Sequence, residues 1–106
     1  MTELEIVKIN LESLELRWIP INSECVSGYR VMLHQSSNIV REEIIPPPHI
    51  SSRQTWIYFN LKNLSPLSVY NISVQAFSGK DEGNKSWLTN VLINPSTYMN
   101  MYIMYI

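Results

Sequence analysis

Residues 13–21 read Ser-Leu-Glu-Leu-Arg-Trp-Ile-Pro-Ile, and this stretch decides the fold class. From Leu14 to Trp18, apolar side chains alternate with the charged Glu15 and Arg17. This period of two places apolar groups on one face of a strand and charges on the other. A helix cannot sort the side chains in this way. The stretch therefore predicts a half-buried β-strand.

The same alternation recurs at residues 29–34, 57–61 and 70–76. Clusters of Gly, Pro, Ser and Asn separate these runs, which is typical of an all-β sandwich or barrel. We therefore predict a two-sheet antiparallel sandwich of the immunoglobulin-like type, which usually has about seven strands. The strands are expected near residues 4–9, 13–20, 28–35, 39–45, 55–61, 68–77 and 86–93.

The length of 106 residues fits one domain, since single domains most often have about 100 to 150 residues. With 45% hydrophobic and 16% charged residues, the chain is too apolar for disorder and too evenly polar for a membrane protein. We expect residues 1–95 to form the domain and residues 96–106 to lie outside it. A continuing strand or a linker is the alternative for this apolar tail, which is far short of the roughly 20 residues that span a bilayer.

Charge excludes two classes of partner. The formal net charge is −1, and the eight basic residues are scattered from Lys8 to Lys85. Nucleic acids and anionic membranes are bound by clustered positive charge, which this chain lacks. We expect neither a nucleic-acid partner nor insertion of this chain into a membrane.

A motif in the second half of the chain resembles that of a known family. Leu64, Pro66, Ser68 and Tyr70 read L-x-P-x-S-x-Y. This resembles the fibronectin type III family at the turn into its sixth strand. The resemblance implies a tyrosine corner, in which the ring packs in the core and its hydroxyl bonds to the backbone a few residues upstream.

Other positions agree with this resemblance, which covers roughly residues 4–94. Trp18 stands where the family has the core tryptophan of its second strand, and Gly28-Tyr29-x-Val31 is similar to the start of the third. Residues 79–86 are similar to the loop before the last strand. The family's introductory prolines are absent, which suggests a truncated amino-terminal boundary, and neither R-G-D nor the W-S-x-W-S of cytokine receptors occurs.

Catalytic and metal-binding constellations are missing from the sequence. His34 and His49 are the only histidines and Cys25 is the only thiol, with none at metal-ligand spacing. No serine lies in a G-x-S-x-G motif, and no glycine-rich loop leads into a helix. We expect no enzymatic activity, no cofactor, no metal and no small-molecule substrate.

Two further features leave alternatives open. Cys25 has no partner for an internal disulfide, so we expect a small, partly buried side chain, with a disulfide to another chain as the alternative. The prolines at 46–48 cannot donate ladder hydrogen bonds, so they mark a boundary of the sheet. A role as a proline-recognition ligand is the alternative, although three prolines fall short of a P-x-x-P helix.

Three sequons are present, at Asn63, Asn71 and Asn84, and they favour a secreted setting. Asn84 is the most accessible in our interpretation because it falls in the loop expected at residues 78–85. That loop, with Lys80, Asp81 and Glu82, is also the candidate contact for a partner, together with residues 22–27.

Another candidate contact is a strand face. Outward-pointing side chains of two neighbouring strands are expected to form a flat, mostly polar surface. They are Arg30, Met32, His34, Asn71, Ser73 and Gln75.

The resemblance implies a non-catalytic module that binds or spaces proteins, as in the ectodomains of adhesion molecules and receptor tyrosine phosphatases or kinases. The expected partner is a protein of unknown identity. An intracellular scaffold or cytoskeletal sandwich, or an accessory domain of a larger enzyme, is the alternative. Residues 1–6 lack a secretory signal, so the chain is either a piece of a longer extracellular protein or cytoplasmic.

Overall fold

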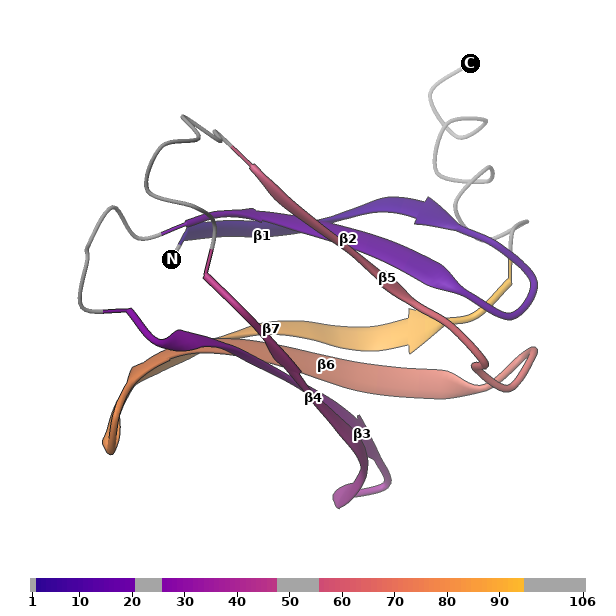
Figure 1. Cartoon of the computed structure of the whole chain (residues 1–106). Helices are drawn as coiled ribbons and strands as arrows, with labels where there is room; N and C mark the ends of the chain where they lie inside the picture. The colour runs from indigo at the N-terminus through magenta and orange to yellow at the C-terminus, as the bar shows by residue number, and fades with distance from the viewer. Residues whose placement is uncertain (1, 21–25, 48–55, 95–106) are drawn as a thin grey trace.

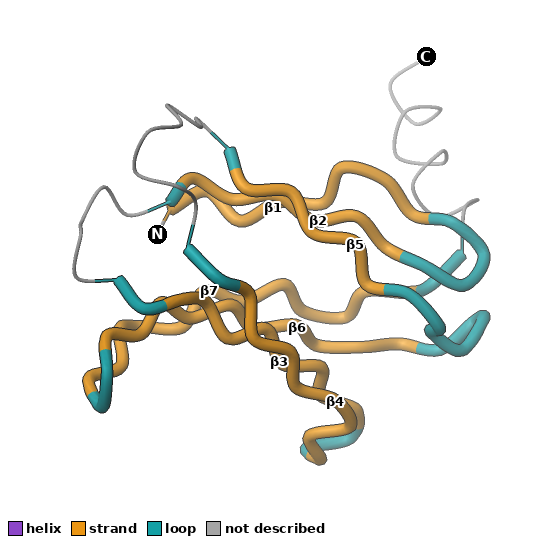
Figure 2. Tube along the Cα trace, viewed as in Figure 1, coloured by secondary structure: helices purple, strands orange, loops and turns teal. Residues whose placement is uncertain are grey.

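The computed structural model describes residues 2–20, 26–47 and 56–94. These residues form strands and short connections, and none of them is helical (Figure 2). The predictions for Cys25, His49, Pro48 and residues 96–106 fall outside the described residues.

Seven antiparallel strands form two sheets that lie one above the other (Figure 1). The three-stranded sheet has the order β1-β2-β5, and the four-stranded sheet has the order β4-β3-β6-β7. The strands are β1 (Thr2–Ile9), β2 (Leu14–Ile19), β3 (Gly28–Gln35), β4 (Asn38–Ile45), β5 (Ile57–Leu61), β6 (Val69–Ser78) and β7 (Asp81–Leu92). The predicted all-β, immunoglobulin-like sandwich is therefore confirmed.

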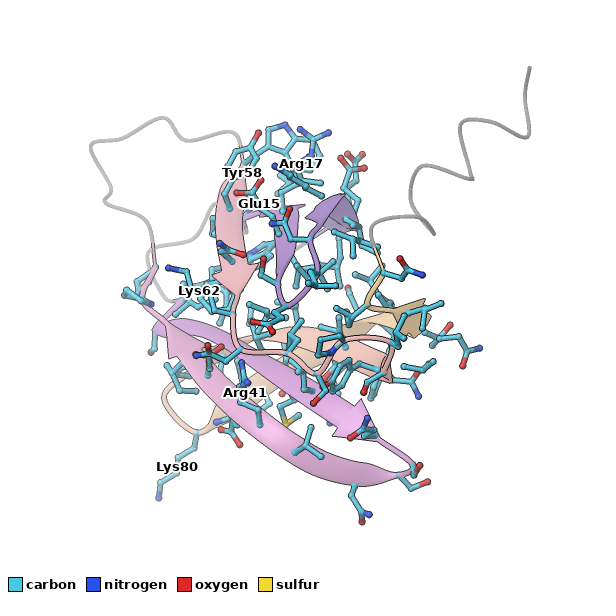
Figure 3. The ribbon with its side chains drawn as sticks, turned by 90° about the vertical axis from the view of Figure 1, so that its right-hand side faces the viewer. Glu15, Arg17, Arg41, Tyr58, Lys62 and Lys80 are labelled. Carbon is cyan, nitrogen blue, oxygen red and sulfur yellow. The ribbon has the colours of Figure 1, made fainter. Side chains whose placement is uncertain are left out.

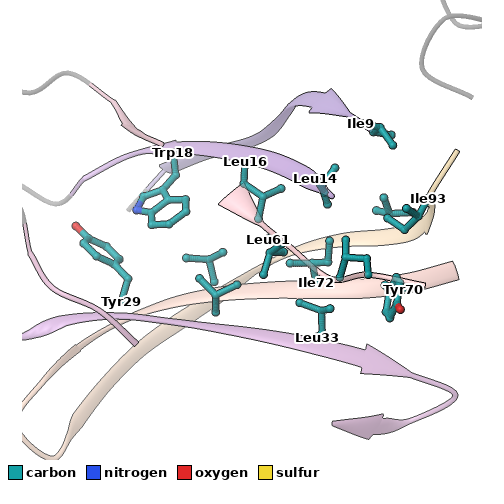
Figure 4. Packing of buried hydrophobic residues seen from close by; sticks show 14 of the residues in the cluster. Ile9, Leu14, Leu16, Trp18, Tyr29, Leu33, Leu61, Tyr70, Ile72 and Ile93 are labelled. Carbon is teal, nitrogen blue, oxygen red and sulfur yellow. The ribbon is translucent and has the colours of Figure 1, made fainter. Parts of the chain in front are cut away.

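The hydrophobic core lies between the two sheets and is built from the residues that alternation assigned to it (Figure 4). In β2, Leu14, Leu16 and Trp18 are fully buried. The Trp18 ring packs against Tyr29 of the opposite sheet, with centroids 5.5 Å apart and a tilt of 56° between the planes. Such tilted aromatic pairs add to the stability gained from burial alone.

The predicted tyrosine corner is present at the start of β6. The Tyr70 hydroxyl accepts a hydrogen bond from the Ser65 backbone N–H at 3.1 Å. Leu64 is buried, and its N–H donates to the Glu12 carbonyl at 2.8 Å, while Pro66 is exposed. The corner thus ties the β5–β6 turn to β6 and to the β1–β2 turn.

The loop expected at residues 78–85 is instead a tight hairpin, because β7 begins at Asp81 and not at residue 86. The two turn residues are Gly79, at φ 57°, and Lys80. The Gln75 side-chain amide donates to the Gly83 carbonyl at 2.7 Å and holds this polar stretch against β6. Pairing with β6 therefore overrides the weak strand propensity of the sequence.

The β3–β4 connection is a second tight hairpin, drawn as a short turn in Figure 2. Ser36 and Ser37 have φ values of 51° and 72°, the left-handed region. Two successive left-handed residues define a type I′ turn, whose twist matches that of the flanking strands. This hairpin places β4 at the edge of the four-stranded sheet.

Candidate interaction surface

The candidate contact residues Lys80, Asp81 and Glu82 lie on the β6–β7 hairpin and are exposed. Lys80 projects from the tip (Figure 3), whereas Asp81 and Glu82 are paired with Ser78 and Phe77 in the ladder. The hairpin is anchored to the neighbouring connection, because the Gly79 N–H donates to Ser27 Oγ at 3.0 Å. The residues predicted as a loop therefore sit on a paired strand end, and Ser27 lies beside them as expected.

The side chains predicted for the outward face of the four-stranded sheet lie on that face, but several of them are not exposed to solvent. Met32, Ser73 and Gln75 at its centre are buried. Ser73 lies opposite Trp87 in the ladder, and its hydroxyl is 3.4 Å from His34 Nε2. Burial on this face depends on the neighbouring strands with which these positions are paired, and the period-two pattern of one strand cannot reveal it. The expectation of an open, flat polar face was wrong.

Arg30 joins this sheet face to the hairpin. Its guanidinium forms an ion pair with Glu82 of β7, and its Nε lies 3.0 Å from Glu42 Oε1 of β4. The same group lies 5.3 Å from the centre of the Phe77 ring. The hydrogen bond to Glu82 raises the pKa of Arg30 from its already high ordinary value. Arg30 is thus a fixed positive charge that connects the hairpin and the sheet face into one surface.

Trp87 dominates the same face on β7. Its side chain is 47% exposed, and its ring centroid lies 4.9 Å from that of His34. Lys85 Nζ lies 5.8 Å from the ring on the same strand. The sequence analysis did not single out Trp87, because the misplaced start of β7 left Lys85 in a loop and hid the alternation of Lys85 and Trp87 that would have marked it.

The outward face of the three-stranded sheet carries a second cluster, visible around Glu15, Arg17 and Tyr58 in Figure 3. Arg17 lies over the Trp56 ring at 4.1 Å and pairs with Glu5. Its pKa is raised, first by the hydrogen bond to the Tyr58 hydroxyl at 3.4 Å and then by Glu5. Trp56 is partly exposed here.

The three sequon asparagines occupy different surroundings. Asn63 is exposed in the β5–β6 turn, and Asn84 is exposed but lies within β7, so its predicted loop position was wrong. Asn71 is partly buried, and its Oδ1 accepts the Asn90 backbone N–H at 2.8 Å. The Asn71 side chain therefore supports an irregular point in the β6–β7 ladder.

Metal-binding clusters are absent from the described residues: no three His, Cys, Asp or Glu side chains there are placed to hold an ion. No helix long and apolar enough to cross a membrane occurs in that part of the chain either.

Taken together, the two facing antiparallel sheets and the tyrosine corner define an immunoglobulin-like β-sandwich module. The sequence profile named "Fibronectin type III domain" matches residues 1–91. The chain therefore belongs to the fibronectin type III domain family.

One curated relative is Tyrosine-protein phosphatase 99A of Drosophila melanogaster, 33% identical over 85 residues. The match covers 78% of this chain but only 6% of that phosphatase.

Solved structures agree in fold. The chicken CNTN1 FN1-FN3 domains match with a TM-score of 0.70 and 16% identity, covering 88% of this chain and 31% of that one. A computer-redesigned β-sandwich protein matches with a TM-score of 0.66 and 18% identity, covering 88% and 92%. The fn3 domain of the human collagen alpha-1(XX) chain gives a TM-score of 0.59 at 19% identity, covering 83% and 78%.

Proposed function

We propose that this chain is a non-catalytic protein-interaction module within the extracellular part of a larger adhesion or receptor protein. The observation that carries the proposal is the ion pair of Arg30 with Glu82, which joins the exposed hairpin of Lys80 and Asp81 to the sheet face that bears Trp87. Membership of the fibronectin type III family and similarity to a part of a tyrosine phosphatase support this setting. A purely spacing role would leave this surface without a contact.

The chemistry of the surface suits a protein partner. Arginine and tryptophan are enriched among the residues that dominate binding energy at protein interfaces. Arg30 is held from two strands by Glu42 and Glu82, and Trp87 is flanked by His34. Side chains already fixed in the free protein lose little entropy on binding, which favours affinity.

A binding screen tests the proposal. A multivalent form of the chain is screened against a panel of cell-surface ectodomains. The affinity of each ectodomain that binds is then measured with the parent chain and with surface variants. We expect Trp87→Ala, and separately Lys80→Ala with Asp81→Ala, to weaken binding by more than about fivefold, which corresponds to roughly 1 kcal/mol. Glu82 is left intact because its removal would also release Arg30.

Tyr58→Ala on the opposite sheet is the matched control, since Tyr58 is similarly exposed at 51%. We expect it to leave affinity unchanged. Binding that survives both surface variants and is lost with Tyr58→Ala would refute this surface. If no ectodomain on the panel binds specifically, that result contradicts the interaction role itself.

A further inference from the structure

Strand β4 is an edge strand that exposes apolar side chains. Among the described residues it pairs with β3 on one side and with no strand on the other (Figure 1). Val40 is 50% exposed and Ile44 is 53% exposed. An edge strand offers unpaired backbone N–H and C=O groups to another strand, and proteins that avoid such pairing usually shorten or distort the edge.

β4 is the most regular of the long edges. Its ladder with β3 has a single irregularity, near Val40, whereas the ladders of the edge strands β1 and β7 each have two. Strand β5, the remaining edge, has five residues against eight in β4.

We propose that β4 pairs antiparallel with β4 of a second copy of this chain. With Glu42 on the two-fold axis, Val40 of one copy faces Ile44 of the other, and Arg41 faces Glu43. Each of these pairs occurs twice by symmetry. Apolar pairs and opposite charges across neighbouring strands both stabilise a sheet. This inference does not rest on the proposed partner surface.

Charge selects this register over its neighbours. A shift of the axis to Arg41 places Arg41 opposite itself and Val40 opposite Glu42. A shift to Glu43 places Glu43 opposite itself and Ile44 opposite Glu42. Each shift sets two like charges directly against each other, places an apolar side chain opposite a carboxylate and loses the Arg41–Glu43 pairs, all of which weaken a strand pair.

In the favoured register only Glu42 meets its own copy. That carboxylate lies 3.0 Å from Arg30 Nε in each chain, so its charge is partly compensated there by a guanidinium that it shares with Glu82. The register therefore combines two apolar pairs and two ion pairs with one partly compensated like-charge contact, and a second copy is the complementary partner for this edge.

Sedimentation equilibrium of the chain, at concentrations up to about millimolar, tests the inference. We expect a reversible monomer–dimer equilibrium that Ile44→Lys weakens about tenfold or more, because two cross-strand apolar pairs are lost at once. Leu11→Lys is the matched control: Leu11 is 60% exposed in the β1–β2 turn, away from β4. We expect this control to dimerise like the parent chain.

A mixing experiment tests the register itself. Glu43→Arg leaves two positive side chains at the paired positions, and Arg41→Glu leaves two negative ones. Each variant alone should dimerise more weakly than the parent, and the mixture should form a heterodimer at least about tenfold tighter than either homodimer. Circular dichroism checks the fold of Arg41→Glu, because Arg41 also donates to the Asn63 carbonyl at 3.0 Å.

Three results would overturn the inference. In the first, the chain remains monomeric at all concentrations. In the second, Ile44→Lys leaves the affinity of the dimer unchanged, as it would if the copies associated through the apolar tail. In the third, Ile44→Lys weakens the dimer but the charge-swapped variants show no preference for each other, and the proposed register is then wrong.

Discussion

The tyrosine corner gives the sharpest prediction for stability. Tyr70→Phe removes one hydroxyl and leaves the buried ring in place, so no cavity forms in the core. The hydroxyl accepts the Ser65 N–H at 3.1 Å. A typical intramolecular hydrogen bond contributes about 0.5–1.5 kcal/mol net, and an unsatisfied donor left behind costs somewhat more. We expect a loss of about 1–2 kcal/mol in the free energy of unfolding.

Urea denaturation followed by circular dichroism measures this loss. With a slope of about 2 kcal/mol per molar urea, which is typical of a small domain, the midpoint should fall by roughly 0.5–1 M. Tyr58→Phe is the control, because its exposed hydroxyl accepts a long hydrogen bond of 3.4 Å from Arg17. Its midpoint should stay near that of the parent. Equal midpoints for Tyr70→Phe and the parent would refute the role of the corner.

The two sheets and the ladder give further predictions. Trp18→Ala should cost about 3–5 kcal/mol in a denaturation experiment, and the partly exposed Trp56→Ala much less; the reverse order would mean that the strand phase is wrong. Gly79→Ala should cost about 1 kcal/mol, because Gly79 has a φ of 57° that favours glycine; an unchanged midpoint would contradict this. In a secretory cell, glycopeptide mass spectrometry should find Asn84 more fully glycosylated than Asn71, whose Oδ1 is engaged; a glycan on Asn71 alone would contradict the assignment.

Period-two alternation predicted the inner faces well, because one side of each strand is buried by the other sheet whatever its partners are. Trp18 and Tyr29 illustrate this, since both lie on the apolar side of their strands and meet in the core. The corner was predictable for a related reason. Ser65 and Tyr70 form their hydrogen bond within one short segment, so the spacing of the motif in the sequence already contains the geometry.

The candidate site was harder to predict because it depends on pairing between distant strands. Arg30 and Glu82 are brought together only by the β3–β6–β7 order. Likewise, Ser73 is buried by neighbours on other strands and not by its own apolarity. The polar residues around Gly83 read as a loop until their partner on β6 is known.

The most direct test of the proposed surface is a chemical-shift map. Amide signals of the isotope-labelled chain are followed by NMR while an ectodomain that it binds is added. We expect the largest changes at the β6–β7 hairpin from Ser78 to Trp87 and at Arg30 on β3. Changes confined to the opposite sheet, around Arg17 and Tyr58, would contradict the proposal that the hairpin and the four-stranded sheet form one binding surface.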